Sequence, residues 1–260
     1  MEEVMVSNNY FPKSIQQLRL IISMAIAVLA ISCNKADAPD MFKTTGEPTI
    51  ELRSLGNLHT LDISNNVDVT IFYDSLSYIE VACGKNLLPK VETTFENGIL
   101  KIRNKNKWNF VRNYEKSKIE VRVHSPALEK IIYEGGGEIK SGNTLTYPSL
   151  TLETQQGSSD VLLDLNCNHI DAILHTGVSN LYLSGNCQSA YFYSNGFSII
   201  RAENLQCDNV HVNNQSTGDF YVYALSTLLV EVYTYSTTFY RGNPTLTIYR
   251  EGTGQVRQLP

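Results

Sequence analysis

The sequence predicts an all-β fold, a parallel β-helix or solenoid in which each coil takes about 20 residues. Three observations support this class. The C-terminal half repeats with that period, and its repeats alternate apolar and polar residues. The body is also rich in Thr, Val and Tyr, residues that favour strands. No window beyond the N-terminal segment has a convincing helical period, so we expect no helices there.

The repeat is clearest in five consecutive pieces of 20 residues that begin at Tyr147. Residues two apart in a strand point to the same face. The fourth and sixth residues of each piece are apolar: Leu150/Leu152, Ile170/Ala172, Ala190/Phe192, Val210/Val212 and Val230/Val232. Each piece therefore predicts one coil, whose core is completed only by the coils stacked on either side.

A turn and a second alternating strand follow in each piece, as in Val161/Leu163. Two further series recur every 20 residues and predict a stacked corner: Asn166, Asn186 and Gln206, and beside them Cys167, Cys187 and Cys207. The cysteines could be packed thiols, a disulfide between neighbouring coils or metal ligands. A leucine-rich repeat also fits the period, but it needs a helical turn that the β-branched, glycine-punctuated second halves disfavour.

The N-terminal segment has the features of a secretory signal. Lys13 and Arg19 precede the apolar run 20–31, which is shorter than the ~20 residues of a membrane-spanning helix. The run leads into LAISC, which resembles the lipobox of bacterial lipoproteins. We therefore expect a lipoprotein signal peptide over residues 1–32 and lipidation of Cys33. The alternative is an ordinary cleaved signal with a coincidental cysteine.

The rest of the chain divides by composition. Residues 33–50 are polar and contain Pro and Gly, which predicts the lipidated cysteine followed by a flexible tether. We expect N-terminal strands and first coils over residues 51–126 and regular coils over residues 127–260. The pair Asn97-Gly98 predicts a hairpin, and these N-terminal strands would cap the base of the solenoid.

The segments VDVTI, YIEVACGKNLLPKV, ENGILKI and SKIEVRVHSPALEKIIYEGGGEI follow one another in the N-terminal half. Together they resemble the opening of the head-GIN-domain family, labelled auto-transporter adhesins and common as lipoproteins of Bacteroidetes-type bacteria. The resemblance covers about residues 52–256. It implies a right-handed β-helix-like fold and an adhesin-like role, and it brings no catalytic residues with it.

Outward positions of the repeat form a candidate ligand face. In the 20-residue frame, Asp171, Tyr191, His211 and Glu231 share one column, and Tyr193 and Tyr233 share the next. Coils stack ~4.8 Å apart, so His211 and Glu231 could touch. A His–Glu pair without a nucleophile or second acid is weak support for catalysis. A solvated ladder of side chains is the simpler interpretation.

A second candidate is a basic and aromatic loop. It is made of Lys105, Lys107, Trp108, Phe110, Arg112 and Tyr114. In an exported protein, anionic glycans or lipid headgroups suit such a loop better than nucleic acid does, and the net charge of −5 also argues against nucleic acid. The alternative is a long hairpin loop whose aromatic side chains pack on the solenoid.

These features predict a cell-envelope lipoprotein that is anchored by lipid in the outer membrane, on its periplasmic or surface face, and that binds or scaffolds without catalysis. We expect no metal and no cofactor. The expected partners are the membrane, a glycan or surface protein, and a second copy docked through the terminal coil. One alternative is a carbohydrate-active β-helix enzyme, a lyase or hydrolase of envelope or host glycans. Another is a purely structural periplasmic protein.

Overall fold

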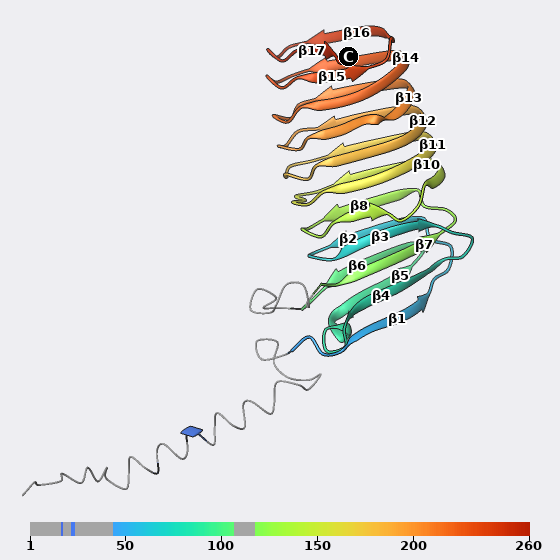
Figure 1. The fold of residues 1–260 in the computed structure, drawn as a ribbon, viewed down its shortest axis with the longest axis vertical. Coiled ribbons are helices and arrows are strands. Elements are labelled where there is room, and N and C mark those ends of the chain that lie inside the picture. Colours follow the sequence, from blue (N-terminus) through green and yellow to red (C-terminus); the bar gives the residue numbers. More distant parts are fainter. Residues whose placement is uncertain (1–16, 18–21, 24–43, 107–117) are drawn as a thin grey trace, which may run out of the picture.

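The computed structural model describes residues 17, 22–23, 44–106 and 118–260 and shows a β-solenoid (Figure 1). In residues 44–106 and 118–260 the only helical element is one 3₁₀ turn, Leu88–Lys90. None of the helical residues within the described part of the chain forms a helix long and apolar enough to cross a membrane. The expected all-β solenoid is confirmed, and the helical turns that a leucine-rich repeat needs are not found in these coils.

The regular part of the solenoid is a stack of long parallel strands, yellow to orange in Figure 1. They are β10 (Leu145–Thr154), β11 (Val161–Leu174), β12 (Leu181–Ser194), β13 (Ile200–Asn214) and β14 (Phe220–Val232). Ile170 pairs with Ala190 and Ala190 with Val210, as the 20-residue repeat predicts. The stack continues through β15 (Thr238–Arg241), β16 (Thr245–Arg250) and β17 (Val256–Gln258).

Each long strand bends at a corner and so contributes to two walls around one core. In β11 the buried residues alternate from Val161 to Cys167, and the alternation then shifts by one residue so that Ile170, Ala172 and Leu174 are buried. We call residues 161–166, and the residues stacked with them, wall 1. Residues 169–174 and their stacked partners form wall 2. The bend lies where Asn166 and Cys167 stack on Asn186 and Cys187.

The N-terminal strands extend both walls, but in an order that differs from the chain. They are β2 (Thr60–Ser64), β3 (Asp68–Tyr73), β6 (Ile99–Asn104), β7 (Glu120–Ser125), β8 (Lys130–Glu134) and β9 (Ile139–Ser141). On wall 2, β2 lies between β6 and β8, and on wall 1, β3 lies between β7 and β9. The first coil is therefore enclosed by coils that come later in the sequence.

Antiparallel strands close the base, as expected of a cap. β1 (Pro48–Ser54) pairs antiparallel with β4 (Tyr78–Gly84), which pairs antiparallel with β7. β5 (Val91–Glu96) and β6 form the predicted hairpin. Its turn residues Asn97 and Gly98 have φ angles of 50° and 78°, and a two-residue turn with positive φ at both positions matches the twist of the strands.

The final coils are shorter than the repeat predicts, and this corrects the 20-residue frame. Val210 pairs with Leu228 rather than Val230, so β14 is 18 residues from β13 on wall 2. The register shifts twice at the corner, between Ala202 and Gln206 and again between Cys207 and Asn209 of β13, with a net loss of two residues. Alternation is kept because two residues, an even number, are lost. The inward pair of the fifth piece is therefore Leu228/Val230, with Val232 one step further along.

Candidate functional site

Five of the six residues predicted to form a ligand face lie on the outer side of wall 2, and the sixth, Tyr233, follows its end. Asp171, Tyr191 and His211 stack directly on one another in β11, β12 and β13, as predicted. Glu231 does not continue their column, because Leu229 pairs with His211 there. The shorter corner of β14 moves Glu231 into the next column, beside Asn213 and in line with Tyr193. Tyr233, the next outward residue after Glu231, lies past the end of β14.

His211 and Glu231 nevertheless touch across the diagonal between columns. His211 Nε2 lies 2.6 Å from Glu231 Oε1. The other carboxylate oxygen accepts hydrogen bonds from the Tyr233 hydroxyl at 2.8 Å and from Asn213 Nδ2 at 3.2 Å. The Tyr191 ring lies 4.9 Å from the His211 ring, centroid to centroid. The face is thus a connected polar and aromatic network rather than a row of separate side chains.

The electrostatics of this network keep Glu231 ionised. Partial burial raises the pKa of Glu231, but the hydrogen bonds from Tyr233 and His211 outweigh it and hold that pKa below its usual value. The same hydrogen bond raises the pKa of Tyr233, since its hydroxyl donates to a carboxylate. Glu231 therefore acts as an anchored acceptor that orients its neighbours. A general acid would instead need a raised pKa.

Two further histidine–carboxylate pairs on wall 2 were missed by the sequence reasoning. His169 Nε2 lies 3.0 Å from Asp171 Oδ1, and His175 Nε2 lies 3.7 Å from Glu153 Oε1. His169 lies at an outward position of the same strand as Asp171, and His175 directly follows the end of that strand. Extending the alternation by one step in each direction would have found them.

Wall 1 carries a second ordered column that the sequence reasoning also missed. Its members pair directly with one another from coil to coil: Lys140, Leu162, Tyr182, Arg201, Tyr221, Phe239 and Arg257. The Arg201 guanidinium lies 4.4 Å from the centre of the Tyr221 ring, which stacks on Phe239 at 4.9 Å. A groove of about 500 Å³ runs beside Lys140, Tyr182 and Arg201. Each of the central positions lies between two buried apolar residues, as Tyr182 does between Leu181 and Leu183, so the alternation predicts that its side chain points outward.

The three corner cysteines stack as the sequence predicts. Cys167 pairs with Cys187, and Cys187 pairs with Cys207. All three are buried and free, and the Cys167 and Cys187 sulfurs lie 2.9 Å apart. Among the residues that the structure describes, no group of three or more His, Cys, Asp or Glu side chains is arranged to hold a metal ion.

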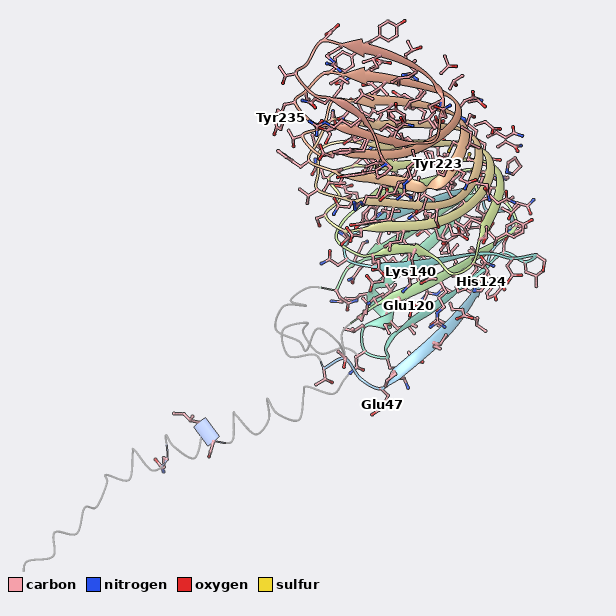
Figure 2. All side chains as sticks on the ribbon, turned by 45° about the horizontal axis from the view of Figure 1, so that its top comes forward. Glu47, Glu120, His124, Lys140, Tyr223 and Tyr235 are labelled. Atoms are coloured by element: carbon pink, nitrogen blue, oxygen red, sulfur yellow. The ribbon has the colours of Figure 1, made fainter. Side chains whose placement is uncertain are left out.

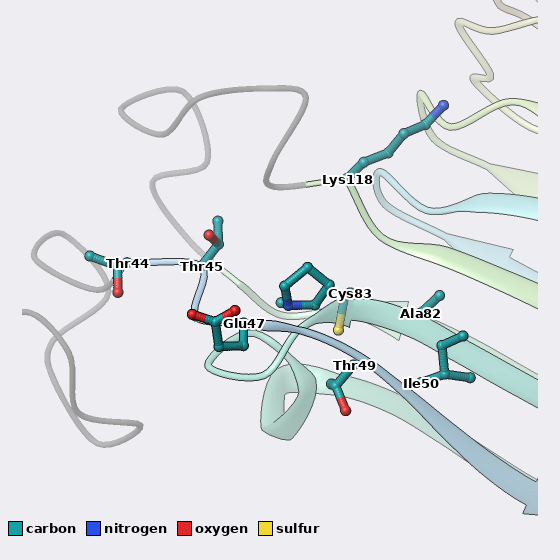
Figure 3. Close-up of a pocket in the computed structure, with 11 residues that line it drawn as sticks. Thr44, Thr45, Glu47, Thr49, Ile50, Ala82, Cys83 and Lys118 are labelled. Carbon is teal, nitrogen blue, oxygen red and sulfur yellow. The ribbon is translucent and has the colours of Figure 1, made fainter.

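A hollow of about 1130 Å³ opens at the base of the solenoid beside β1 and β4 (Figure 3). Glu47, Ile50, Cys83 and Lys118 line it. Burial raises the pKa of the Cys83 thiol to about 11, so Cys83 is a weak nucleophile at neutral pH. Two of its lining residues, Thr44 and Lys118, directly follow segments that lie outside the described residues, and we assign the hollow no ligand.

Several predicted site residues also lie outside the described residues. They are the lipidation site Cys33 and five members of the basic and aromatic loop: Lys107, Trp108, Phe110, Arg112 and Tyr114. Lys105, the sixth member, is described, and its Nζ lies 2.6 Å from Glu92 Oε2. Other exposed side chains project from every wall, and Tyr235 extends from a turn near the C-terminal end (Figure 2).

Comparison with known proteins finds a matching family and similar solved structures. The family model described as "Putative auto-transporter adhesin, head GIN domain" matches residues 57–244. No protein in the comparison with curated proteins matches the chain.

Three solved structures illustrate the similarity of fold. A "putative adhesin" from Bacteroides fragilis has a TM-score of 0.75 and 21% identity, over 82% of this chain and 97% of its own. A "putative adhesin" from Parabacteroides distasonis has a TM-score of 0.61 and 18% identity, over 82% and 98%. A "putative lipid binding protein" from the same species has a TM-score of 0.62 and 17% identity, over 83% and 98%. At these identities the likeness shows the fold alone.

Proposed function

Because this chain belongs to the head GIN domain family, we propose that it is a non-catalytic binding module of the bacterial cell envelope. Its ligand is a saccharide, bound along the outer face of wall 2, and a lipid on Cys33 holds it to a membrane. The family description and the structural neighbours named as adhesins support a role at the cell surface. The LAISC segment supports the anchor.

One observation carries the proposed binding role. Parallel pairing holds Tyr191 and Tyr193 beside His211 and Asn213 of the next coil, at the ~4.8 Å spacing of neighbouring strands. Tyrosine offers an apolar ring face and a polar hydroxyl, and the neighbouring amide and carboxylate groups offer hydrogen bonds. Because the backbone ladder fixes these groups before any ligand arrives, little conformational entropy is lost on binding.

The spacing of Asp171 and Glu231, the two acids of the candidate ligand face, does not suit glycoside hydrolysis. Glycosidases place two carboxyl groups ~5–9.5 Å apart across the scissile bond. Asp171 of β11 and Glu231 of β14 are separated by three strand spacings, or about 14 Å. Both oxygens of Glu231 are already engaged by neighbouring side chains. These two acids therefore do not form the arrangement that the enzymatic alternative needs.

The saccharide proposal is tested by binding of the purified chain, carrying Cys33→Ala, to a panel of polysaccharides. We expect retention on at least one of them and a loss of affinity of tenfold or more in the double variant Tyr191→Ala, Tyr193→Ala. Tyr182→Ala, on wall 1, is the matched control and should bind like the parent chain. Retention on no polysaccharide, or unchanged binding by the double variant, contradicts the proposal. Release of reducing ends would favour the enzymatic alternative.

The anchor is tested separately by growing cells that express the full chain with labelled palmitate. We expect the label on the wild-type chain and none on Cys33→Ala, since the diacylglyceryl group is attached through that thiol. Equal labelling of both chains would contradict the anchor without bearing on the saccharide face.

A further inference from the structure

The corner between the two walls carries the three stacked thiols of Cys167, Cys187 and Cys207. They belong to β11, β12 and β13 and pair directly in register. The Cys167 and Cys187 sulfurs are 2.9 Å apart, within contact distance of each other. The saccharide face of wall 2 does not use these thiols.

We propose that this cysteine ladder is a redox modification site, in which Cys187 and one neighbour form a disulfide between coils and the third thiol stays free. The oxidant is a disulfide-bearing molecule, either a small disulfide such as oxidised glutathione or the disulfide of an oxidoreductase. The proposal is independent of the saccharide ligand.

Strand spacing decides which pairs can form. Neighbouring strands lie ~4.7–4.9 Å apart, which falls within the ~4.4–6.8 Å that separates the Cα atoms of a disulfide. Cys167 and Cys207 are two coils apart, about 9.5 Å, and beyond the ~7 Å limit. Cys187 is therefore a member of every disulfide that the ladder can form. Either Cys167 or Cys207 can be its partner.

An opening at the corner gives an oxidant access to the ladder. A groove of about 280 Å³ lies over the corner, and Cys167 and Cys187 line it together with Asn166, Gln188 and Asp208. Cys167 and Cys187 retain 8% and 6% of their accessible surface, whereas Cys207 retains 1%. The accessible pair is therefore Cys167–Cys187. Because Cys207 is almost fully buried, it can join a disulfide only by thiol–disulfide exchange with Cys187.

The central position also makes Cys187 the nucleophile. Hydrogen bonds with the thiols of Cys167 and then Cys207 lower the pKa of Cys187, and they outweigh the effect of its burial. The same contacts raise the pKa of Cys167 and Cys207. The thiolate is the species that attacks a disulfide. Attack on the oxidant should therefore begin at Cys187.

The reaction proceeds in two exchanges that balance. The Cys187 thiolate attacks one sulfur of the oxidant RSSR, the S–S bond of the oxidant breaks, RS⁻ leaves, and Cys187 is left in a mixed disulfide with the other RS group. Cys167 then loses its proton and attacks the Cys187 sulfur, which forms the Cys167–Cys187 bond and releases the second RS⁻. The two protons lost by the protein convert both leaving groups to RSH. Cys207 can attack Cys187 in the same way and release Cys167.

The test uses the chain carrying Cys33→Ala, incubated with oxidised glutathione, blocked with an alkylating agent and digested without reduction. Cleavage at Asp171 separates Cys167 from Cys187, and cleavage after Arg201 separates Cys187 from Cys207. Mass spectrometry of the fragments therefore distinguishes the two linkages. Cys83, buried away from other cysteines in the described structure, reports whether oxidation is confined to the ladder.

Each single variant has its own expected product. The parent chain should lose two thiols and yield mainly the Cys167–Cys187 linkage. Cys207→Ser should yield that linkage alone, and Cys167→Ser should yield Cys187–Cys207. Cys187→Ser should keep both remaining thiols free. The disulfide restricts the unfolded chain, and this stabilises the folded state. Oxidised Cys207→Ser should therefore melt roughly 5–10 °C higher than its reduced form. Cys187→Ser should show no such rise.

Two results would overturn the inference. One is a parent chain whose ladder thiols all remain free after incubation, and the other is a Cys167–Cys207 linkage formed in Cys187→Ser. If Cys187→Ser fails to fold, Cys187→Ala replaces it, because a methyl group is tolerated in a buried thiol site better than a hydroxyl.

Discussion

The carboxylate of Glu231 shows how one side chain organises its surroundings. It accepts hydrogen bonds from Tyr233 and Asn213 at one oxygen and contacts His211 at the other. Its side chain is 20% exposed, so these bonds are partly shielded from water. Hydrogen bonds to a charged group contribute more than neutral ones, and a net value of about 1 kcal/mol is reasonable at this exposure.

At the residue scale we therefore expect Glu231→Gln to lower the free energy of unfolding by about 1 kcal/mol at neutral pH. The pKa of Glu231 in the folded chain is lowered, so its contribution is complete above the unfolded value of ~4.3 and is lost as pH falls through the folded value. Urea unfolding of both chains at several pH values measures this. The difference between them should shrink below about pH 4.3.

Glu96→Gln is the control for that comparison. Glu96 is an exposed residue of β5, and its replacement should change stability little at any pH. A Glu231→Gln chain as stable as the wild type at neutral pH, or a deficit that persists unchanged to about pH 3, would show that the network contributes nothing through the charge of Glu231.

At the scale of one element, Gly185 explains how β12 turns its corner. Gly185 has a φ of 104°, and a Cβ placed there would lie 2.0 Å from the Leu165 carbonyl oxygen of the coil below. Both features exclude a side chain: the backbone conformation favours glycine, and the neighbouring ladder leaves no room. The glycine therefore permits the strand to bend while its coil stays paired with the next.

We expect Gly185→Ala to lower the free energy of unfolding by roughly 2–4 kcal/mol, because either the strand pairing opens or the backbone is strained. Chemical denaturation measures the change. Ser184→Ala, one residue earlier, removes one hydrogen bond to Asp164 Oδ1 and should cost about 1 kcal/mol or less. A Gly185→Ala chain no less stable than Ser184→Ala would refute this account of the corner.

At the scale of the whole molecule, the two ends of the described stack are closed differently. Antiparallel strands close the base, whereas β16 and β17 each pair with a strand on one side only within the described residues. Leu246 and Ile248 continue the buried columns of Leu228 and Val230 but are 36% and 39% exposed. Apolar side chains beside unpaired strand edges favour association with a second copy.

We therefore expect the chain to self-associate through this end and the double variant Leu246→Lys, Ile248→Lys to be monomeric, as measured by sedimentation over a range of concentrations. Thr247→Lys adds a charge between them on the outward side of β16 and should still associate. A wild-type chain that stays monomeric at all concentrations, or equal disruption by Thr247→Lys, would contradict this.

Particular residues show how far a sequence can predict such a fold. Cys167, Cys187 and Cys207 were placed correctly because the coils between them keep a constant length at the corner. Glu231 was placed in the wrong column because β14 loses two residues at its corner. An even deletion leaves the alternation intact, so the pattern carries no sign of it. The alternation marks Arg201 as outward, but the 20-residue period does not align it with Tyr182, because the two paired residues are 19 apart.

The sequence by itself determined the local order of this protein: the alternating strands, the 20-residue period, the Asn97-Gly98 hairpin and the all-β class. Those features follow from side-chain direction and turn chemistry, which act between near neighbours. Only the tertiary structure decided that β2 lies between β6 and β8 and that His211 contacts Glu231 diagonally. Both depend on which strand edges meet and in what register, and that choice is made by packing between distant segments.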